Sequence, residues 1–204
     1  MISVIIPAYN EGNYLKRCVE SVILSSQLCP CNVEIIPVLN VKHCANARNL
    51  GVRDSQGSIL VFVDADCVVS RNFLSEIYEK SLNPYFIGGG TKYVQLDKLS
   101  PGRIAFLLVI GVYLYFHRIT VGAFWVRKEV FNKLNGFKEI DGEDVDFAFR
   151  LKKYAKNNKK KFESLKRSYI VWSTRAFDKH GDWHWLGKYK TYHSPRTTGG
   201  TILL

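Results

Sequence analysis

The chain has 204 residues and a formal net charge of +11, from 29 Lys and Arg against 18 Asp and Glu. Hydrophobic residues make up 47% and charged residues 23%, a composition that is ordinary for a globular protein and excludes a disordered chain. Residues 1–102 hold nine basic and nine acidic side chains, whereas residues 103–204 hold 20 basic and nine acidic ones. A strongly basic half indicates nucleic acid or an anionic membrane as a partner, and the motifs must decide between them.

The length fits one domain over residues 1–204. The longest apolar run, residues 104–116, has 13 residues, whereas a membrane-spanning helix needs about 20. We expect a core helix there, with an interfacial or docking surface as the alternative. The N-terminal residues do not have the pattern of a secretory signal, so we expect a cytoplasmic protein. The cysteines have no framework spacing and are expected to be reduced thiols: Cys18, Cys29, Cys31, Cys44 and Cys67.

Strands and helices alternate in the first half. The predicted elements are, in order, a strand at 3–6 closed by Pro7, a helix at 13–26, a strand at 33–39, a helix at 45–52, a strand at 59–63 and a helix at 72–80. This order predicts an α/β domain in which helices flank a mostly parallel sheet. Ligands bind such sheets at the carboxyl ends of the strands, so the loops 7–12, 40–43 and 64–67 are the candidates for a site.

The second half has a less regular pattern. We predict a strand at 85–94 interrupted by Gly88-Gly89-Gly90, a helix at 127–134 that ends at Asn135-Gly136, and a helix at 144–156. Six lysines follow or end that last helix: Lys152, Lys153, Lys156, Lys159, Lys160 and Lys161. No repeat or low-complexity linker divides the chain, which again favours one domain.

Asp64-Ala65-Asp66 is the sharpest local motif. It follows an apolar strand, where two carboxylates one residue apart can converge on a divalent cation and on phosphate or ribose groups. Mg²⁺ or Mn²⁺ held in this way would neutralise a diphosphate leaving group. The competing interpretation is a pair of exposed acids that end the strand.

The motifs around this triplet resemble those of the family 2 glycosyltransferases, which have the Rossmann-like GT-A fold and use nucleotide-diphosphate sugars. The resembling segments lie in the family's order: Ile2–Glu11, Ala47–Gly51, Val61–Cys67, Val121–Phe131, Asn135–Phe137 and Gly142–Asp146. They extend over residues 2–151. The resemblance implies a nucleotide-sugar-binding half at 1–102 and an acceptor-binding half with the catalytic base at 103–204.

The resemblance also implies site residues. Nucleotide-sugar binding would fall to Pro7, Ala8, Tyr9, Glu11, Arg48, Asp64, Ala65 and Asp66, with Asp66 and Asp64 as ligands of Mg²⁺ or Mn²⁺. Asp144 matches the catalytic base of inverting members, which removes the proton of the attacking acceptor hydroxyl. Glu143 and Asp146 compete for that role. Groups near the donor or acceptor phosphate would be Gly122, Glu143 and Arg175.

One segment departs from the family pattern. Members usually end the second strand with an Asp-rich loop that contacts the base, whereas this chain has Asn40-Val41-Lys42-His43. Asn40 can donate to and accept from a uracil or guanine edge, so we assign it to the donor site. The missing Asp supports the alternative of a non-catalytic nucleotide-sugar or polyanion-binding module with a degenerate donor site.

Residues after Ser168 give weaker signals. Arg175 could face a diphosphate or a lipid phosphate, or lie in solvent. A third metal ligand could come from His180, His184 or His193, of which we name His180. Trp183 and Trp185 could line an acceptor groove or a membrane interface, or form a hydrophobic corner.

The motifs together predict a metal-dependent, inverting glycosyltransferase. It would move a sugar from a UDP or GDP donor to a saccharide or lipid-phosphate acceptor. No nucleic-acid-binding module accompanies the lysines, so we expect no nucleic acid and favour peripheral contact with the cytoplasmic face of a membrane. No Gly-x-Gly-x-x-Gly follows a strand and no P-loop lysine motif is present, which argues against a dehydrogenase or a P-loop enzyme.

Overall fold

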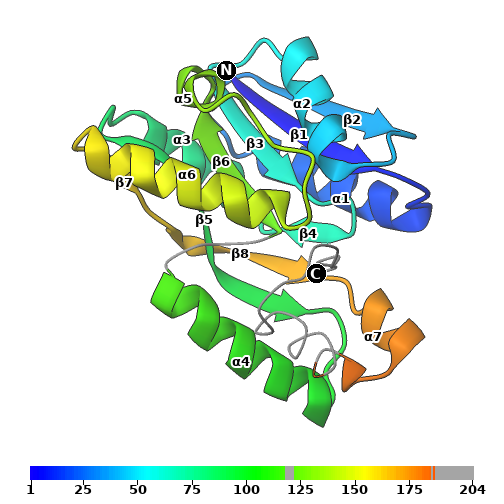
Figure 1. Ribbon diagram of the computed structural model, residues 1–204. Helices are drawn as coiled ribbons and strands as arrows, with labels where there is room; N and C mark the ends of the chain where they lie inside the picture. Colours follow the sequence, from blue (N-terminus) through cyan, green and yellow to red (C-terminus); the bar gives the residue numbers. More distant parts are fainter. Residues whose placement is uncertain (118–121, 185, 187–204) are drawn as a thin grey trace.

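A computed structural model describes residues 1–117, 122–184 and 186, with the side chains of 113–117 left out. The elements are β1 (Ile2–Ala8), α1 (Asn13–Ser26), β2 (Val33–Leu39), α2 (Cys44–Asp54), β3 (Ile59–Val63), β4 (Cys67–Val69), α3 (Phe73–Ser81), β5 (Phe86–Leu96), α4 (Pro101–His117), β6 (Ala123–Arg127), α5 (Lys128–Lys133), α6 (Glu143–Asn157), β7 (Lys161–Phe162), β8 (Leu165–Trp172) and α7 (Arg175–His180). Figure 1 shows helices on both faces of one twisted sheet.

The strands form a mixed sheet in the order β2-β1-β3-β6-β5-β8-β4, with β7 beside β5. The β2, β1 and β3 strands are parallel, as the alternating pattern predicted. β6 runs antiparallel to both β3 and β5, and β4 runs antiparallel to β8. Four of the seven pairings among the described strands are parallel, so the sheet is mostly parallel by a narrow margin.

Two hydrophobic cores lie on opposite faces of this sheet. Because side chains alternate along a strand, β3 sends Val61 to one core and Phe62 to the other. The first core also takes side chains from α1 and α3, and the second takes side chains from α2, α5 and α6. Phe62 packs there against the rings of Phe124, Phe131 and Phe137, with centroids 5.0–5.6 Å away. The central strands of the sheet are therefore covered by packed helices on both faces.

Pro7 does not end the first strand, and Gly88-Gly89-Gly90 do not interrupt β5, although the sequence predicted both effects. β1 continues through Pro7 to Ala8, because its pairing with β3 ends at Ile5 and Pro7 needs no donor on that side. β5 runs without interruption through its three glycines. A Cβ on Gly89 would lie 1.8 Å from the carbonyl oxygen of Glu163, so the missing side chain lets two backbone segments approach closely.

The prediction of a core helix at 104–116 is wrong. α4 lies along one edge of the molecule, and none of its described side chains belongs to either core (Figure 1). Its outer face exposes Ile104, Leu108 and Val112, which are 46%, 67% and 57% exposed. Spaced four residues apart, they form one stripe along the helix. Among the described residues no helix has both the length and the apolar character needed to cross a membrane.

Candidate active site

The Asp64-Ala65-Asp66 loop leaves β3 at the carboxyl edge of the sheet. The Asp64 backbone N–H donates to the carbonyl oxygen of Gly122 at 3.0 Å. Gly122 has a φ of +82°, and a Cβ there would lie 2.1 Å from Nε1 of Trp172. Gly122 is therefore required for close packing against the loop, because a side chain would be strained by the backbone and blocked by the indole. Ala65 is buried, while the carboxylates of Asp64 and Asp66 are 37% and 25% exposed.

Arg48, from α2, joins this loop to the start of α6. Its guanidinium donates to Oδ1 of Asp64 at 2.7 Å and to Oε1 of Glu143 at 2.5 Å. The side chain is 5% exposed and lies over the Phe137 ring, 5.2 Å from its centroid. Burial by itself would lower the pKa of Arg48, but the surrounding carboxylates raise it above its ordinary value. Arg48 is thus a buried, permanently charged bridge between two acidic segments.

The residues beside Arg48 hold the same loop. Asn49 donates from Nδ2 to the carbonyl oxygen of Phe137 at 2.9 Å and accepts the Phe137 N–H at 3.0 Å. Asn46 donates to a carboxylate oxygen of Glu139 at 3.0 Å. One face of α2 therefore fixes the loop that leads into α6. The nucleotide contact predicted for Arg48 stays a prediction, since the structure shows its guanidinium engaged with carboxylates.

Asp144 lies in the first turn of α6, next to the residue that Arg48 holds. Its Oδ1 accepts the N–H of Val145 at 2.8 Å, and it forms no ion pair with the described residues. Burial is the main cause of a raised pKa for Asp144. Arg48 opposes the shift, whereas Asp64 and Glu143 add to it. A carboxylate with a raised pKa and no counter-ion is a better base than a paired one.

The two competing acids are both paired with arginines. Glu143 accepts from Arg48, and Asp146 accepts from Nε of Arg150 at 2.6 Å. Arg150 also donates to the backbone carbonyls of Leu134 and Gly136, at 2.7 and 2.9 Å. Asp146 is therefore part of the bonding that holds the loop after α5. Of the three acids, Asp144 has the geometry and the charge environment that best fit a base.

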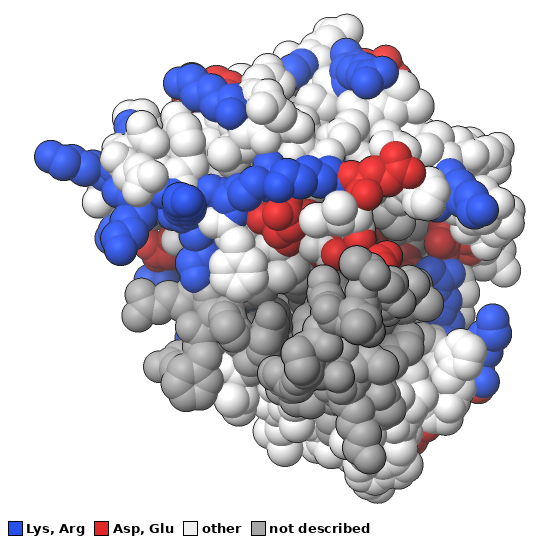
Figure 2. Space-filling model, in the orientation of Figure 1, with Lys and Arg blue, Asp and Glu red and all other residues white. Residues whose placement is uncertain are grey.

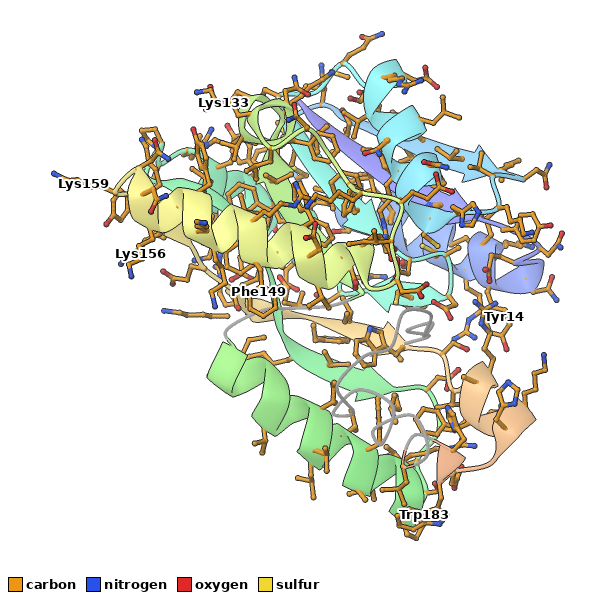
Figure 3. All side chains as sticks on the ribbon, in the orientation of Figure 1. Tyr14, Lys133, Phe149, Lys156, Lys159 and Trp183 are labelled. Carbon is orange, nitrogen blue, oxygen red and sulfur yellow. The ribbon has the colours of Figure 1, made fainter. Side chains whose placement is uncertain are left out.

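Arg175, the first residue of α7, approaches the other side of the Asp-x-Asp loop. It donates to both carboxylate oxygens of Glu11 and places Nε 3.1 Å from Oδ2 of Asp66. Its guanidinium also lies 5.4 Å from the ring centroid of Tyr14, which Figure 3 labels on α1. Burial raises the pKa of Asp66 to about 6, and Asp64 adds to that shift while Arg175 opposes it. The structure therefore brings Glu11, Asp66 and Arg175 together, and the ligand contacts predicted for them stay predictions.

The other residues predicted to bind the nucleotide lie at the ends of β1 and β2. Pro7 and Ala8 are the last two residues of β1 and are buried, whereas Tyr9, which follows them, is 48% exposed. Asn40 follows β2 in the left-handed region with a φ of +61°, and its N–H donates to the carbonyl oxygen of Ala8 at 3.0 Å. The structure therefore brings Asn40 to the end of β1, next to the residue that precedes the exposed Tyr9.

The described residues contain no group of three His, Cys, Asp or Glu side chains arranged to hold a metal ion. His180 ends α7, with its ring centroid 5.9 Å from that of His184, so its role as a third ligand stays a prediction. His193 and Trp185 lie outside the described residues, and Trp183 is 55% exposed. The charges nevertheless suit a divalent cation, because two arginines, Arg48 and Arg175, face five carboxylates, those of Glu11, Asp64, Asp66, Glu143 and Asp144.

Sequence reasoning missed the contacts that position α7. Arg103, at the start of α4, is 8% exposed and donates to Asp178 at 2.7 Å and to Asp182 at 2.8 Å. The Thr174 N–H donates to Oδ1 of Asp97 at 2.9 Å. These partners lie more than 70 residues apart in the chain, so no local pattern indicates them. The three contacts hold α7, which carries Arg175, in place.

The cysteines are free thiols, as predicted. Two of them lie beneath the Asp-x-Asp loop: Cys18 donates to the carbonyl oxygen of Asp64 at 3.5 Å, and Cys67 is buried directly after Asp66. Burial raises the pKa of Cys18 to about 12, with Asp64 and Asp66 adding to the shift. These thiols are therefore protonated and act as small apolar side chains under the site.

Comparisons with known proteins show a family and a fold to which the chain is similar. Glycosyltransferase GlyG of Streptococcus pneumoniae serotype 4 (strain ATCC BAA-334 / TIGR4) is 26% identical over a match that covers 39% of this chain and 35% of that protein, so the chain spans about a third of that relative. The mannosyltransferase PcManGT of Pyrobaculum calidifontis, solved with GDP-Man and Mn²⁺, superposes with a TM-score of 0.59 at 14% identity, over 83% of this chain and 56% of that one. A variant of Drosophila β1,4-galactosyltransferase 7, solved with manganese, UDP-Gal and xylobiose, has a TM-score of 0.58 at 13% identity, over 81% and 65%.

The two solved structures confirm the predicted GT-A fold. The sequence model of glycosyl transferase family 2 matches residues 3–41 and 32–157, which include the Asp-x-Asp loop, the α2 segment and the first turn of α6. On this match, which extends over most of the chain, the protein belongs to glycosyl transferase family 2.

Proposed function

We propose that this chain transfers a sugar from a nucleotide-diphosphate donor, of UDP or GDP type, to a saccharide or lipid-linked hydroxyl or phosphate, with inversion at the anomeric carbon. The observation that carries the proposal is Arg48, which bonds Asp64 of the Asp-x-Asp loop and Glu143 of the base turn at once. A single buried side chain thus brings a diphosphate-binding loop and a free carboxylate, Asp144, into one site.

On the donor side, Tyr9 offers an exposed ring for the base and Asn40 offers an amide beside it. Asp64 and Asp66 would hold Mg²⁺ or Mn²⁺, which supplies charge neutralisation of the diphosphate leaving group when bound. Arg175 is placed to face the same phosphates from α7, and Gly122 supports the loop by accepting the Asp64 N–H. The assignment of each residue is part of the proposal.

On the acceptor side, Asp144 removes the proton of the attacking hydroxyl as the new glycosidic bond forms. A base that lies across the sugar from the leaving group gives one displacement step and inversion. Glu143 keeps its hydrogen bond to Arg48 and so fixes the backbone that carries Asp144. Burial and the nearby acids raise the pKa of Asp144, so its carboxylate holds the abstracted proton more strongly than an exposed carboxylate would.

Basic and apolar side chains on the surface support contact with an anionic acceptor or membrane, although Lys156 and Lys159 lie at the opposite end of α6 from Asp144. Figure 2 shows Lys and Arg side chains gathered over α6 and acidic side chains next to them. Lys156 and Lys159 project from the end of α6 away from the core (Figure 3). The exposed stripe of α4 and the exposed Trp183 supply apolar groups for peripheral contact at the cytoplasmic face of a membrane. Sedimentation with anionic vesicles, compared with neutral ones, tests that part, and no binding at low salt would remove it.

A donor screen tests the proposed activity. The purified chain is incubated with UDP- and GDP-sugars and Mn²⁺, with saccharide and lipid-phosphate acceptors, and the products are read by mass spectrometry. We expect release of UDP or GDP with one donor, at least 100-fold less with Asp66→Asn, and unchanged release with Glu139→Gln as the control carboxylate. A folded protein that cleaves no donor and binds no nucleotide would instead be the non-catalytic module with a degenerate donor site.

A further inference from the structure

The bonding of Arg48 has a consequence for how the two sides of the site communicate. One guanidinium, on a side chain that is 5% exposed, is shared between Asp64 and Glu143. Its remaining donor, Nε, is buried and has no partner among the described residues. The position of the group is thus set by the two carboxylates and by the Phe137 ring beneath it. A change in the charge of one carboxylate must alter its hold on the other.

We infer that Arg48 is a positioning residue that couples the Asp-x-Asp loop to the turn carrying Asp144, so that neutralising Asp64 tightens the hold of Arg48 on Glu143. The inference deepens the proposed function and rests on it for its biological meaning. In the free protein the two carboxylates compete for one cation. When the negative charge of Asp64 is compensated, as a bound cation or an amide would do, the guanidinium interacts more strongly with Glu143.

The second part of the coupling is mechanical. Hydrogen bonds attach residues 137–143 to α2. Asn49 bonds the backbone N–H and the carbonyl oxygen of Phe137, and Asn46 donates to the carboxylate of Glu139. Arg48 stands between these two residues on α2 and supplies the last hold, on Glu143. A stronger bond to Glu143 therefore pulls on a loop whose other end is already fixed. The first turn of α6, with Asp144, follows directly after this loop, so a stronger bond to Glu143 would hold it more firmly.

The coupling is reciprocal, because a free energy that links two sites acts in both directions. Occupation of the Asp-x-Asp loop would order the base turn, and an ordered base turn would favour occupation of the loop. The donor would in this way prepare the base before the acceptor is engaged. This order of events follows from one buried cation facing two acids and requires no large motion.

Hydrogen exchange followed by mass spectrometry tests the coupling without nucleotide, metal or turnover. Asp64→Asn removes the charge of Asp64 and keeps an acceptor for Arg48. We expect it to slow amide exchange in the peptide covering residues 137–145 at least fivefold, the lower end of typical coupling between sites. Asp54→Asn is the control, because it removes the charge of an exposed carboxylate at the end of α2 that is not part of the Arg48 bridge.

Two further variants show whether the effect passes through Arg48. Arg48→Lys keeps the charge but replaces the fork by a single ammonium, and Glu143→Gln weakens the far end of the bridge. In either background Asp64→Asn should change the exchange rate less than twofold, and Glu143→Gln serves if Arg48→Lys does not fold. An unchanged rate in Asp64→Asn, or the same slowing in both backgrounds, would overturn the inference. Absence of donor turnover in the unmutated protein, with the exchange effect of Asp64→Asn present, would count against the proposed function alone.

Discussion

Replacement of Asp144 by Asn tests the proposed base without disturbing the residues that hold it in place. The substitution keeps the shape of the side chain and the acceptor for the Val145 N–H, but it removes the carboxylate that would take the proton. General-base groups contribute about 10²- to 10⁴-fold to a rate, so turnover should fall by that factor, or roughly 3–5 kcal/mol in barrier height. Nucleotide binding should stay within about threefold of the wild type, since Asp144 forms no ion pair with a described cation and both bonds of Arg48 remain.

The stability of Asp144→Asn should change in the opposite direction from its activity. Because the folded state raises the pKa of Asp144, the ionised carboxylate is less favourable in the folded protein than in the unfolded chain at neutral pH. The neutral amide removes that cost, so the urea midpoint should rise or stay unchanged. Asp146→Asn is the matched comparison: it weakens the bond from Arg150 and should lower stability by about 1 kcal/mol, with turnover retained.

Initial rates of nucleotide release and urea denaturation give both quantities for the two variants. Turnover of Asp144→Asn within threefold of the wild type would refute its role as the base. Loss of turnover in Asp146→Asn with an intact fold would transfer the role to Asp146. Loss of nucleotide binding in Asp144→Asn would mean that this carboxylate serves the donor side.

The remaining predictions concern pH and the core. Since burial raises the pKa of Asp144, the rate should fall as pH falls through a midpoint above the ordinary carboxyl value of about 3.9, and Asp144→Asn should abolish that limb of the pH–rate profile. A limb at the ordinary value would contradict the assigned environment. Phe62→Ala should destabilise the fold by about 3–5 kcal/mol in urea, because the ring is 1% exposed and packs on three other phenylalanine rings; a loss below 1 kcal/mol would contradict that packing.

The sheet and its flanking helices could be predicted where hydrophobic periodicity is strong. The ranges predicted for α1, β2 and β3 coincide with the observed ones, because apolar spacing and the turn residues after each element leave few alternatives. For α4 the sequence left a core helix and an exposed surface as alternatives and favoured the wrong one. A helix that is apolar on most sides looks like a core helix, and only the packing shows that Leu108 lies outside both cores.

In the site, too, short motifs could be predicted from the sequence, whereas contacts between residues far apart in the chain could not. Asp64, Asp66 and Asp144 could be named because each belongs to a short motif at the end or start of an element. The partners that distinguish them could not be named, because Arg48 and Glu143 lie 95 residues apart and Arg175 and Glu11 lie 164 apart. Which acid of residues 143–146 is free to act as a base is decided by such pairings, and these appear only in the folded chain.

Calorimetric titration of the protein with UDP and with GDP, each in the presence and absence of Mn²⁺, tests most directly whether the site binds a nucleotide diphosphate through its Asp-x-Asp loop. We predict that one of the two nucleotides binds in a Mn²⁺-dependent manner and that Asp66→Asn weakens this binding at least tenfold, while Glu139→Gln leaves it unchanged. Absence of binding for both nucleotides with Mn²⁺, or full binding by Asp66→Asn, would contradict the assignment of this site to nucleotide-sugar chemistry.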